Sequence, residues 1–286
     1  MYPPDFDYVR ATSVRETISL LEENRNAKLL AGGHSLIPLL KLRTASADML
    51  IDIGRIDELK GISRINGTFR IGALSTHSYI AATGGLPSAL TDAASHIGDW
   101  QVRNRGTIGG NVAHADPASD HPTVLTALGA NFHISGAHEE RTIPASEFFT
   151  DMFTTALRES EVITVIDVPA RGKDTGSAYA KMIHAASAYS VLGVAAVLSV
   201  IDGRCTAASV AIGGLTPKAT KAPSVESALI GKMLDEATLK AASQAILDDL
   251  GDDILGDFYA SADYRMAMAP EYVHRALKKA AERAGG

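Results

Sequence analysis

The chain has one cysteine, Cys205, among its 286 residues, and this scarcity excludes several kinds of site. One thiol cannot form an intrachain disulfide, and no cysteine–histidine cluster shows the spacing of a zinc site. An iron–sulfur cluster takes about four cysteine ligands, so this chain cannot hold one by itself. If the protein takes part in redox chemistry, another chain must supply any metal centre. Cys205 itself is expected to be a small, buried apolar side chain.

Long apolar runs and blocks of positive charge are also missing. The longest apolar run, residues 191–201, is too short to cross a bilayer, which takes about 20 residues. The formal net charge is −6, and no lysine or arginine block stands out, which argues against a nucleic-acid surface. The start of the chain lacks the apolar region of a secretory signal. These absences predict a cytoplasmic protein with no membrane span.

The pattern of apolar residues predicts an α+β protein in two linked halves. Hydrophobic residues make up 46% of the chain, and the length exceeds one typical domain. In the first half we expect helices at 13–24, 76–83, 86–97 and 121–128, with strands at 28–31, 49–53, 68–73 and 130–135. A turn-rich stretch at 169–176 marks a domain boundary. Beyond it we expect strands at 177–181, 191–201 and 205–212, a hairpin turn at Asp202–Gly203, and helices at 224–230, 235–250 and 270–284.

Two glycine pairs carry the strongest functional signal. One lies in AGGHSL, residues 31–36, and the other in TIGGNVAHADPASD, residues 107–120. Glycine allows backbone N–H groups to turn toward an anion and removes the Cβ that would block close approach. Neither segment has the GxGxxG or GxxxxGK[ST] spacing, so neither predicts a Rossmann or P-loop site. Two such segments predict two loops that close on one extended, phosphate-bearing ligand, as in a dinucleotide binder.

Other polar residues show no pattern typical of catalysis. None of His114, Asp116, His121 and Glu161 has a partner at the spacing of an acid–base pair, so each is expected to be structural and no catalytic residue or metal ligand is assigned. Trp100 is expected to pack in the core.

Motifs along the whole chain resemble one protein family. They are FDYVRATSV, AGGHSLIPLLKLR, IGALSTH, RGTIGGNVAHADPASDHP, ESEVITVIDVP, AYAKM, AIGGLTPKAT and the tail from SADYRMAM to HRAL. In this order they resemble the medium, flavin-binding subunit of the molybdenum hydroxylases. That family includes the carbon monoxide dehydrogenase medium subunit and the flavin domain of xanthine dehydrogenase.

The resemblance implies a fold and a division into domains. Residues 1–175 would form a two-part FAD-binding domain of the vanillyl-alcohol-oxidase (PCMH) type, with parts at roughly 1–55 and 56–175. Residues 176–286 would form a C-terminal domain of antiparallel sheet and helices like that of the carbon monoxide dehydrogenase flavoprotein. FAD would lie between the two parts of the first domain, with its pyrophosphate held by both glycine loops.

The resemblance also implies the cofactor-binding residues. The first loop contributes Ala31, Gly32, Gly33, His34, Ser35 and Leu36, and the second contributes Thr107, Ile108, Gly109, Gly110 and Asn111. Asp120 would make a polar contact to the cofactor, Ile163 would lie beside the isoalloxazine, and Tyr189 would be an aromatic neighbour of the flavin. Lys181 would place a positive charge near the ring and favour the anionic reduced flavin. Some flavoproteins of this fold attach FAD covalently through a histidine, but a non-covalent role is expected for His34.

The sequence departs from the family pattern after that lysine. Many relatives carry arginine and then Gly-Asp-aromatic, whereas this chain reads MIHAASAYSVLG. His184 stands at the arginine position and Ala188 at the aspartate position, while Tyr189 keeps the aromatic. This predicts a less charged flavin edge and leaves the flavin potential and the electron acceptor open.

The implied function is electron transfer within a larger complex. A large molybdopterin subunit would hydroxylate the substrate, and electrons would pass through two [2Fe–2S] clusters of a small subunit to FAD in this chain. The complex is expected to be a dimer of heterotrimers. The weakly favoured substrate class is N-heteroaromatic compounds, with carbon monoxide and aldehydes as alternatives. A self-sufficient flavin oxidase and a non-catalytic nucleotide-binding module are the competing interpretations.

Overall fold

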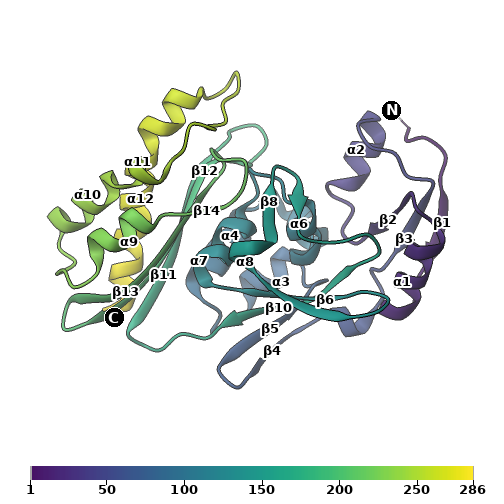
Figure 1. Ribbon diagram of the computed structural model, residues 1–286, viewed down its shortest axis with the longest axis horizontal. Helices are drawn as coiled ribbons and strands as arrows, with labels where there is room; N and C mark the ends of the chain where they lie inside the picture. The colour runs from purple at the N-terminus through teal and green to yellow at the C-terminus, as the bar shows by residue number, and fades with distance from the viewer. Residues whose placement is uncertain (1, 286) are drawn as a thin grey trace.

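The computed structural model describes residues 2–285. Three units follow one another along the long axis of the molecule, with the N-terminus at one end (Figure 1). Each unit has its own sheet, and the strands of each sheet come from one continuous stretch of the chain. The predicted α+β class, with an antiparallel sheet in the last unit, is confirmed.

The N-terminal unit is a small parallel sheet with two helices. Its strand order is β1 (Asp7–Arg10), β3 (Met49–Asp52) and β2 (Ala27–Leu30). Helix α1 (Val14–Glu23) begins at Ser13, whose Oγ accepts from the backbone N–H of Glu16 at 3.1 Å, as the capping pattern predicts. Helix α2 (Leu36–Leu42), which the sequence pattern did not predict, starts where the first glycine segment ends.

The middle unit combines an antiparallel sheet with a layer of short helices. The sheet order is β4 (Ile62–Ile65), β5 (Thr68–Gly72), β10 (Val162–Pro169), β6 (Asn131–Ser135) and β7 (Glu140–Pro144). The helices are α3 (His77–Ala82), α4 (Ser88–His96), α5 (Trp100–Arg105), α6 (Ile108–His114), α7 (Asp120–Leu128) and α8 (Ala145–Phe148). A 3-10 turn, η1 (Asp57–Leu59), precedes the sheet, and a small hairpin, β8 (Phe149–Asp151) and β9 (Thr154–Thr155), follows α8.

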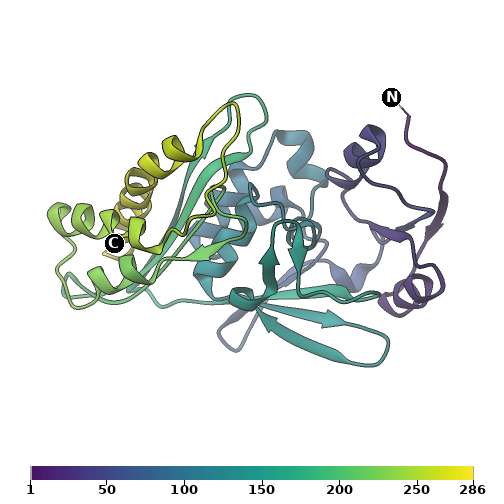
Figure 2. The ribbon, with the colours of Figure 1, turned by 45° about the horizontal axis from the view of Figure 1, so that its top comes forward.

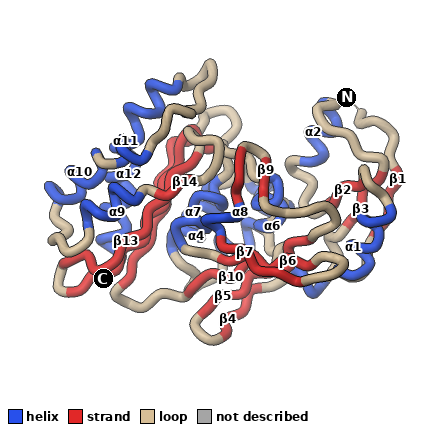
Figure 3. The backbone as a smooth tube through the Cα atoms, viewed as in Figure 1, coloured by secondary structure: helices blue, strands red, loops and turns tan. Residues whose placement is uncertain are grey.

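The C-terminal unit is a four-stranded antiparallel sheet covered by helices, as the strands and helices of Figure 3 show. Its strands are β11 (Thr175–Ile183), β12 (Ser190–Ile201), β13 (Arg204–Gly213) and the short, unpredicted β14 (Thr220–Lys221). Its helices are α9 (Pro223–Leu229), α10 (Glu236–Gln244), α11 (Ile246–Asp249) and α12 (Ala262–Ala284). Positive φ angles at Asp202 and Gly203 confirm the predicted tight turn between β12 and β13.

The unbroken apolar run of β12 follows from its position between two layers. Its side chains divide between the core of the middle unit, which includes Ala195 and Val197, and the core under α12, which includes Val194 and Leu198. A strand that is buried on both faces has no side toward solvent, so its sequence does not alternate between apolar and polar residues. The same arrangement joins the middle and C-terminal units through one continuous packed layer.

Two helix predictions are wrong in their bounds. Helix α12 begins at Ala262 rather than at 270, and Ser261 caps it by accepting from the N–H of Tyr264 at 3.2 Å. Pro270, which the sequence pattern placed at the start, lies inside the helix. The predicted helix at 235–250 is two helices, α10 and α11, that meet at Ala245. None of the helices in residues 2–285 has both the length and the apolar character of a membrane span.

Candidate cofactor site

A cavity of about 670 Å³ lies between the N-terminal and middle units. Its wall includes both glycine segments, strand β10 at Ile163 and the turn between β11 and β12 at 187–189. All of the predicted site residues line this cavity except Ile108 and Lys181. Figure 2 shows the N-terminal unit standing apart from the rest of the molecule on the cavity side. The structure therefore brings residues that are distant in sequence to one site, which we call the cleft.

The first glycine segment connects β2 to α2 and has unused donors. Gly33 has φ of +75°, a conformation that glycine adopts without strain. Within residues 2–285, the backbone N–H groups of residues 32–35 donate no hydrogen bond. The imidazole of His34 folds back, with Nδ1 at 3.0 Å from the Gly32 carbonyl oxygen. Consecutive free N–H groups around a positive-φ residue form a concave site that suits an anion.

The second glycine segment is the first turn of α6, which corrects the prediction of a loop. Thr107 caps this helix by accepting from the N–H of Gly110 at 3.2 Å. The N–H groups of Ile108 and Gly109 donate to the carbonyl oxygens of Ser75 and Ala73 at 3.0 and 2.8 Å. These backbone donors are already used. The segment instead allows a ligand in the cleft to approach its backbone closely, because Gly110 has no Cβ.

Glycine is needed at each position of the second pair for a different structural reason. A Cβ on Gly109 would lie 2.6 Å from the Cβ of Ala73, so this glycine lets α6 pack on the end of β5. A Cβ on Gly110 would lie 3.8 Å from the Cβ of Ala31, which shows that the two glycine segments meet. Ile108 is fully buried in the core and does not reach the cleft.

Asn111 presents an unpaired acceptor at the cleft wall. Its Nδ2 donates to Ser119 Oγ at 3.1 Å, while its Oδ1 is buried and has no partner within the described residues. A buried oxygen without a donor is costly, so this atom is expected to bind a ligand donor. The free donors of the first segment, the bare glycine face and this acceptor together fit an extended ligand with phosphates and hydroxyl or amide groups.

Asp120 and Lys181 form a buried ion pair behind the cleft. Lys181 Nζ lies 2.9 Å from Asp120 Oδ2, and both side chains are almost fully buried. The hydroxyl of Tyr179 donates to Asp120 Oδ1 at 2.7 Å. Burial raises the pKa of Asp120, against the lowering effect of the Lys181 charge. Both carboxylate oxygens are therefore engaged by protein, and the Lys181 charge reaches the cleft only through Asp120.

Tyr179 and Gly193 belong to this arrangement, although the sequence pattern did not indicate them. In the β11–β12 ladder, Lys181 is paired with Gly193, and a Cβ on Gly193 would overlap the Tyr179 hydroxyl. Glycine at this position therefore makes room for the phenol that binds Asp120. The register between β11 and β12 brings Gly193 and Tyr179 together, so no local sequence pattern predicts their contact.

The turn between β11 and β12 lines part of the cleft through residues 187–189. Tyr189 is about half exposed, and burial of its other face raises its pKa. Ala188 has φ of +57°, a conformation that asparagine and aspartate tolerate better than alanine. His184 Nδ1 accepts from the N–H groups of Ala186 and Ser187, both at 3.3 Å, and its ring packs on Tyr259. His184 thus supports the turn.

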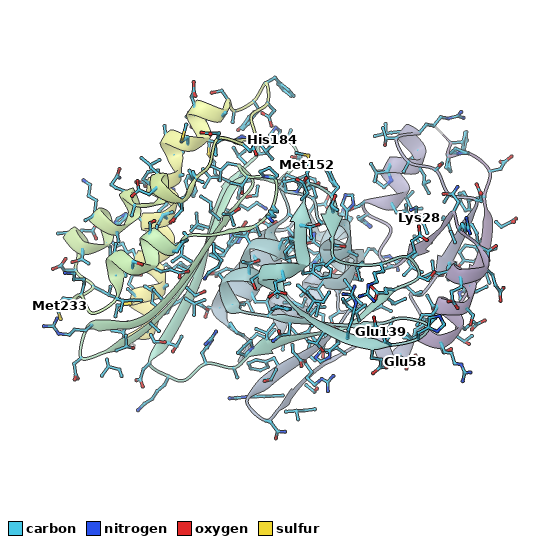
Figure 4. The ribbon with its side chains drawn as sticks, viewed as in Figure 1. Lys28, Glu58, Glu139, Met152, His184 and Met233 are labelled. Carbon is cyan, nitrogen blue, oxygen red and sulfur yellow. The ribbon has the colours of Figure 1, made fainter. Side chains whose placement is uncertain are left out.

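Figure 4 labels one residue of the cleft wall, Lys28, and residues of the two other units. His184 and Met152 are labelled on the side of the molecule where the β11–β12 turn and the β8–β9 hairpin lie, and Lys28 is labelled on the N-terminal unit. Lys28 lines the cleft from the N-terminal side. Phe153, next to Met152, lines it from the other side and packs on His114. Lys28 and Phe153 thus line the cleft from two different units.

Several expectations for single residues have a clear outcome. Cys205 is buried, as predicted. The carboxylate of Glu161 binds Arg141 through both oxygens at 2.7 and 2.8 Å, a contact that agrees with the structural role expected for it. The core position predicted for Trp100 is wrong: its side chain is 71% exposed on α5, with the guanidinium of Arg103 at 4.7 Å from its ring centre. Arg103 lies over the ring as in a cation–π contact, and most of the indole is open to solvent.

Fold and cleft together define a two-part dinucleotide-binding unit joined to a sheet-and-helix domain. Comparison with known proteins identifies its family. Residues 4–171 match the model described as the FAD binding domain in molybdopterin dehydrogenase, and residues 177–280 match the CO dehydrogenase flavoprotein C-terminal domain.

Full-length relatives agree with these matches. The carbon monoxide dehydrogenase medium chain of Hydrogenophaga pseudoflava is 39% identical over 98% of this chain and 98% of that one. The glyceraldehyde dehydrogenase medium chain of Sulfolobus acidocaldarius is 38% identical over 98% of this chain and 100% of that one. A solved structure of quinoline 2-oxidoreductase from Pseudomonas putida 86 has a TM-score of 0.93 at 31% identity and covers 99% of both chains. The chain belongs to the FAD-binding medium subunits of the molybdenum hydroxylases, so the family predicted from the motifs is confirmed.

Proposed function

We propose that this chain binds FAD in the cleft and passes electrons from the [2Fe–2S] clusters of a small partner subunit to an external acceptor. FAD supplies the capacity to exchange electrons with both one-electron and two-electron partners. The observation that carries the proposal is a cofactor-sized cleft in a chain whose single cysteine cannot ligate a cluster. Substrate oxidation would take place on a large molybdopterin subunit.

In this proposal the two glycine segments have unequal roles in holding FAD. The free N–H groups of residues 32–35 support a phosphate contact by the first segment, Ala31 to Leu36. Thr107, Gly109 and Gly110 would shape the floor on which the pyrophosphate lies, and Asn111 Oδ1 would accept a hydrogen bond from the cofactor. Ile108 supports this floor from the core.

The flavin ring would lie toward Ile163 and Tyr189. Ile163 lies directly before a register shift in β10, and its side chain lines the cleft. Tyr189 is held over the opening by the turn that His184 supports. Lys181 would act on the flavin indirectly, since Asp120 lies between its ammonium group and the cleft. His34 would contact FAD without a covalent bond.

The substrate class and the assembly are inferred from relatives. Carbon monoxide and glyceraldehyde dehydrogenases, a nicotine 6-hydroxylase and a caffeine dehydrogenase all contain chains of this type. We keep N-heteroaromatic compounds as the favoured class and carbon monoxide and aldehydes as the alternatives. The proposed assembly is a dimer of heterotrimers in the cytoplasm. The domain boundaries at about residues 55 and 175 also stay predictions.

The test compares the chain alone with the complete complex. The purified chain should bind FAD and show a flavin spectrum, yet it should not oxidise quinoline, nicotinate or aldehydes with an artificial acceptor. The complex with its cysteine-rich and molybdenum-bearing partners should oxidise one of these substrates and reduce the flavin. Turnover by the chain alone would instead establish a self-sufficient flavin oxidase, and a chain without flavin in either form would contradict the proposal.

A further inference from the structure

Two buried imidazoles, His77 and His121, touch at the base of the cleft. His77 is the first residue of α3 and His121 lies in the first turn of α7. His77 Nδ1 is 3.1 Å from His121 Nε2, which is a hydrogen-bond distance. Their exposed fractions are 3% and 0%. The sequence pattern placed neither residue in the site, yet the ring of His77 forms part of the cleft wall.

Both rings are neutral at ordinary pH, so each carries one N–H. Burial lowers the pKa of His77 to about 4, with smaller contributions from the nearby charges of His34 and Arg103. Burial, with smaller electrostatic contributions from neighbouring His77 and Lys181, likewise lowers the pKa of His121 well below its usual value. A neutral imidazole has one donor nitrogen and one acceptor nitrogen. The hydrogen bond between the rings therefore fixes the tautomer of both.

The unpartnered nitrogen of His121 decides the direction of that hydrogen bond. His121 Nδ1 is buried and has no hydrogen-bond partner within the described residues. A buried N–H without an acceptor is rarer in proteins than an underused acceptor, so the proton of His121 belongs on Nε2. His121 Nε2–H then donates to His77 Nδ1. The proton of His77 must consequently lie on its other nitrogen, Nε2.

That second nitrogen of His77 is free to meet a ligand. Within residues 2–285 it makes no hydrogen bond, and His77 lines the cleft although only 3% of the residue is exposed. This nitrogen lies against Gly106, where a Cβ would come within 2.7 Å of it. Gly106 in turn packs on Gly32 of the first glycine segment, so this N–H lies beside the group of free backbone donors.

We propose that His77 is a neutral hydrogen-bond donor to FAD, with Nε2–H directed at an acceptor atom of the cofactor, and that His121 is the positioning residue that fixes this tautomer. The inference rests on the proposed function, because it takes FAD as the ligand of the cleft. A neutral donor suits this place, since its strength does not change with protonation across the physiological range.

The first test measures FAD affinity with variants that separate the two ring nitrogens. The side-chain amide of glutamine reaches the position of Nε2, and that of asparagine only the position of Nδ1. Titration of FAD into deflavinated full-length protein should give roughly tenfold weaker binding for His77→Asn, and His77→Gln should stay within about twofold of wild type. His138→Gln, on an exposed turn outside the cleft, is the matched control and should bind as wild type. Thermal unfolding of the flavin-free proteins checks that each variant folds.

The second test addresses His121 and does not depend on activity. Two-dimensional 15N NMR of the imidazoles should show His77 and His121 protonated at Nε2, both before and after FAD is added. His121→Leu should lose the single tautomer at His77 and weaken FAD binding about threefold, and His121→Gln, which keeps a donor, should restore both.

The outcomes separate this inference from the proposed function. A wild-type chain that binds no FAD, alone or in the complex, overturns the proposed function and the inference with it. Wild-type binding together with unchanged affinity in His77→Asn, or a His77 proton found on Nδ1, overturns the inference alone.

Discussion

Gly32 and Gly33 are adjacent but serve different purposes. A Cβ on Gly32 would overlap the Arg105 carbonyl oxygen, so this glycine lets the first segment pack on the end of α5. A Cβ on Gly33 would lie 3.3 Å from the side chains of Ile37 and Leu30, and the residue also needs φ of +75°. The sequence identified the pair as a site, because glycine pairs followed by small polar residues are typical of anion loops. The sequence could not show that Gly32 is needed for packing and Gly33 for its backbone conformation, because the packing reason depends on where α5 lies.

The Gly33→Val variant is expected to lose FAD and keep its fold. A β-branched residue resists a positive φ and would turn the free N–H groups of residues 32–35 away from a shared anion. The measurement is the flavin-to-protein absorbance ratio after gel filtration, compared with Gly85→Val. Gly85 also has a positive φ, +81°, but lies outside the cleft with no atom within 4 Å of its Cβ position. Equal flavin retention in both variants would show that the first segment does not hold the cofactor.

At the scale of secondary-structure elements, the periodic segments were predictable and the short connecting helices were not. Helices α1 and α7 and strands β5 and β12 lie where apolar spacing and capping placed them. Helices α2, α5 and α6 have seven residues or fewer, too few for an apolar period to stand out. Tertiary hydrogen bonds, such as those from α6 to Ala73 and Ser75, stabilise them instead.

The packing of α12 on β11 gives an element-scale prediction. A Cβ on Gly176 in β11 would overlap the Ala280 carbonyl oxygen of α12 and lie 2.5 Å from the Ala284 nitrogen. Both neighbours are helix backbone and cannot rotate away. Gly176→Ala should therefore destabilise the protein by about 2 kcal/mol or more. Gly172→Ala, four residues earlier with nothing within 4 Å, should change stability by less than about 0.5 kcal/mol. Urea unfolding of both variants measures the difference, and equal midpoints would refute the close contact.

At the scale of the whole molecule, one buried and one partly buried charge pair join the C-terminal unit to the middle unit. Lys181 of β11 binds Asp120 of α7 behind the cleft, and Arg283 of α12 binds Asp92 of α4 at 2.6 Å. The family resemblance predicted Lys181 and Asp120 as cofactor residues, and the structure adds that they bind each other across the unit boundary. No local pattern predicts the Asp92–Arg283 pair, because its members are separated by most of the chain. The cleft residues are thus held in place by a domain that contributes little of the cleft wall.

The Asp92–Arg283 pair should make stability depend on pH in a defined direction. Burial works to raise the pKa of Asp92, but the hydrogen bonds and charge of Arg283, with Lys279, outweigh burial and leave the pKa below its usual value. A carboxylate with a lowered folded-state pKa stabilises the fold above its unfolded pKa of about 3.9, and this contribution is lost as pH falls through the folded-state pKa. Arg283→Met should therefore cost about 2 kcal/mol at pH 7, and the gap from wild type should close progressively below about pH 4.

The matched control for this variant lies on the same helix. Arg275 pairs with Glu271 at 2.8 Å on the exposed side of α12, where an ion pair contributes little. The free energy of unfolding of Arg275→Met, measured by urea unfolding, should stay within about 0.5 kcal/mol of wild type at pH 7 and at pH 3. A loss in Arg283→Met that is as large at pH 3 as at pH 7 would mean that apolar packing of the arginine, and not its charge, joins α12 to α4. An equal loss in both variants would mean that the boundary pair has no special role. With the expected result, the domain whose β11–β12 turn lines part of the cleft is attached by a carboxylate that must remain ionised.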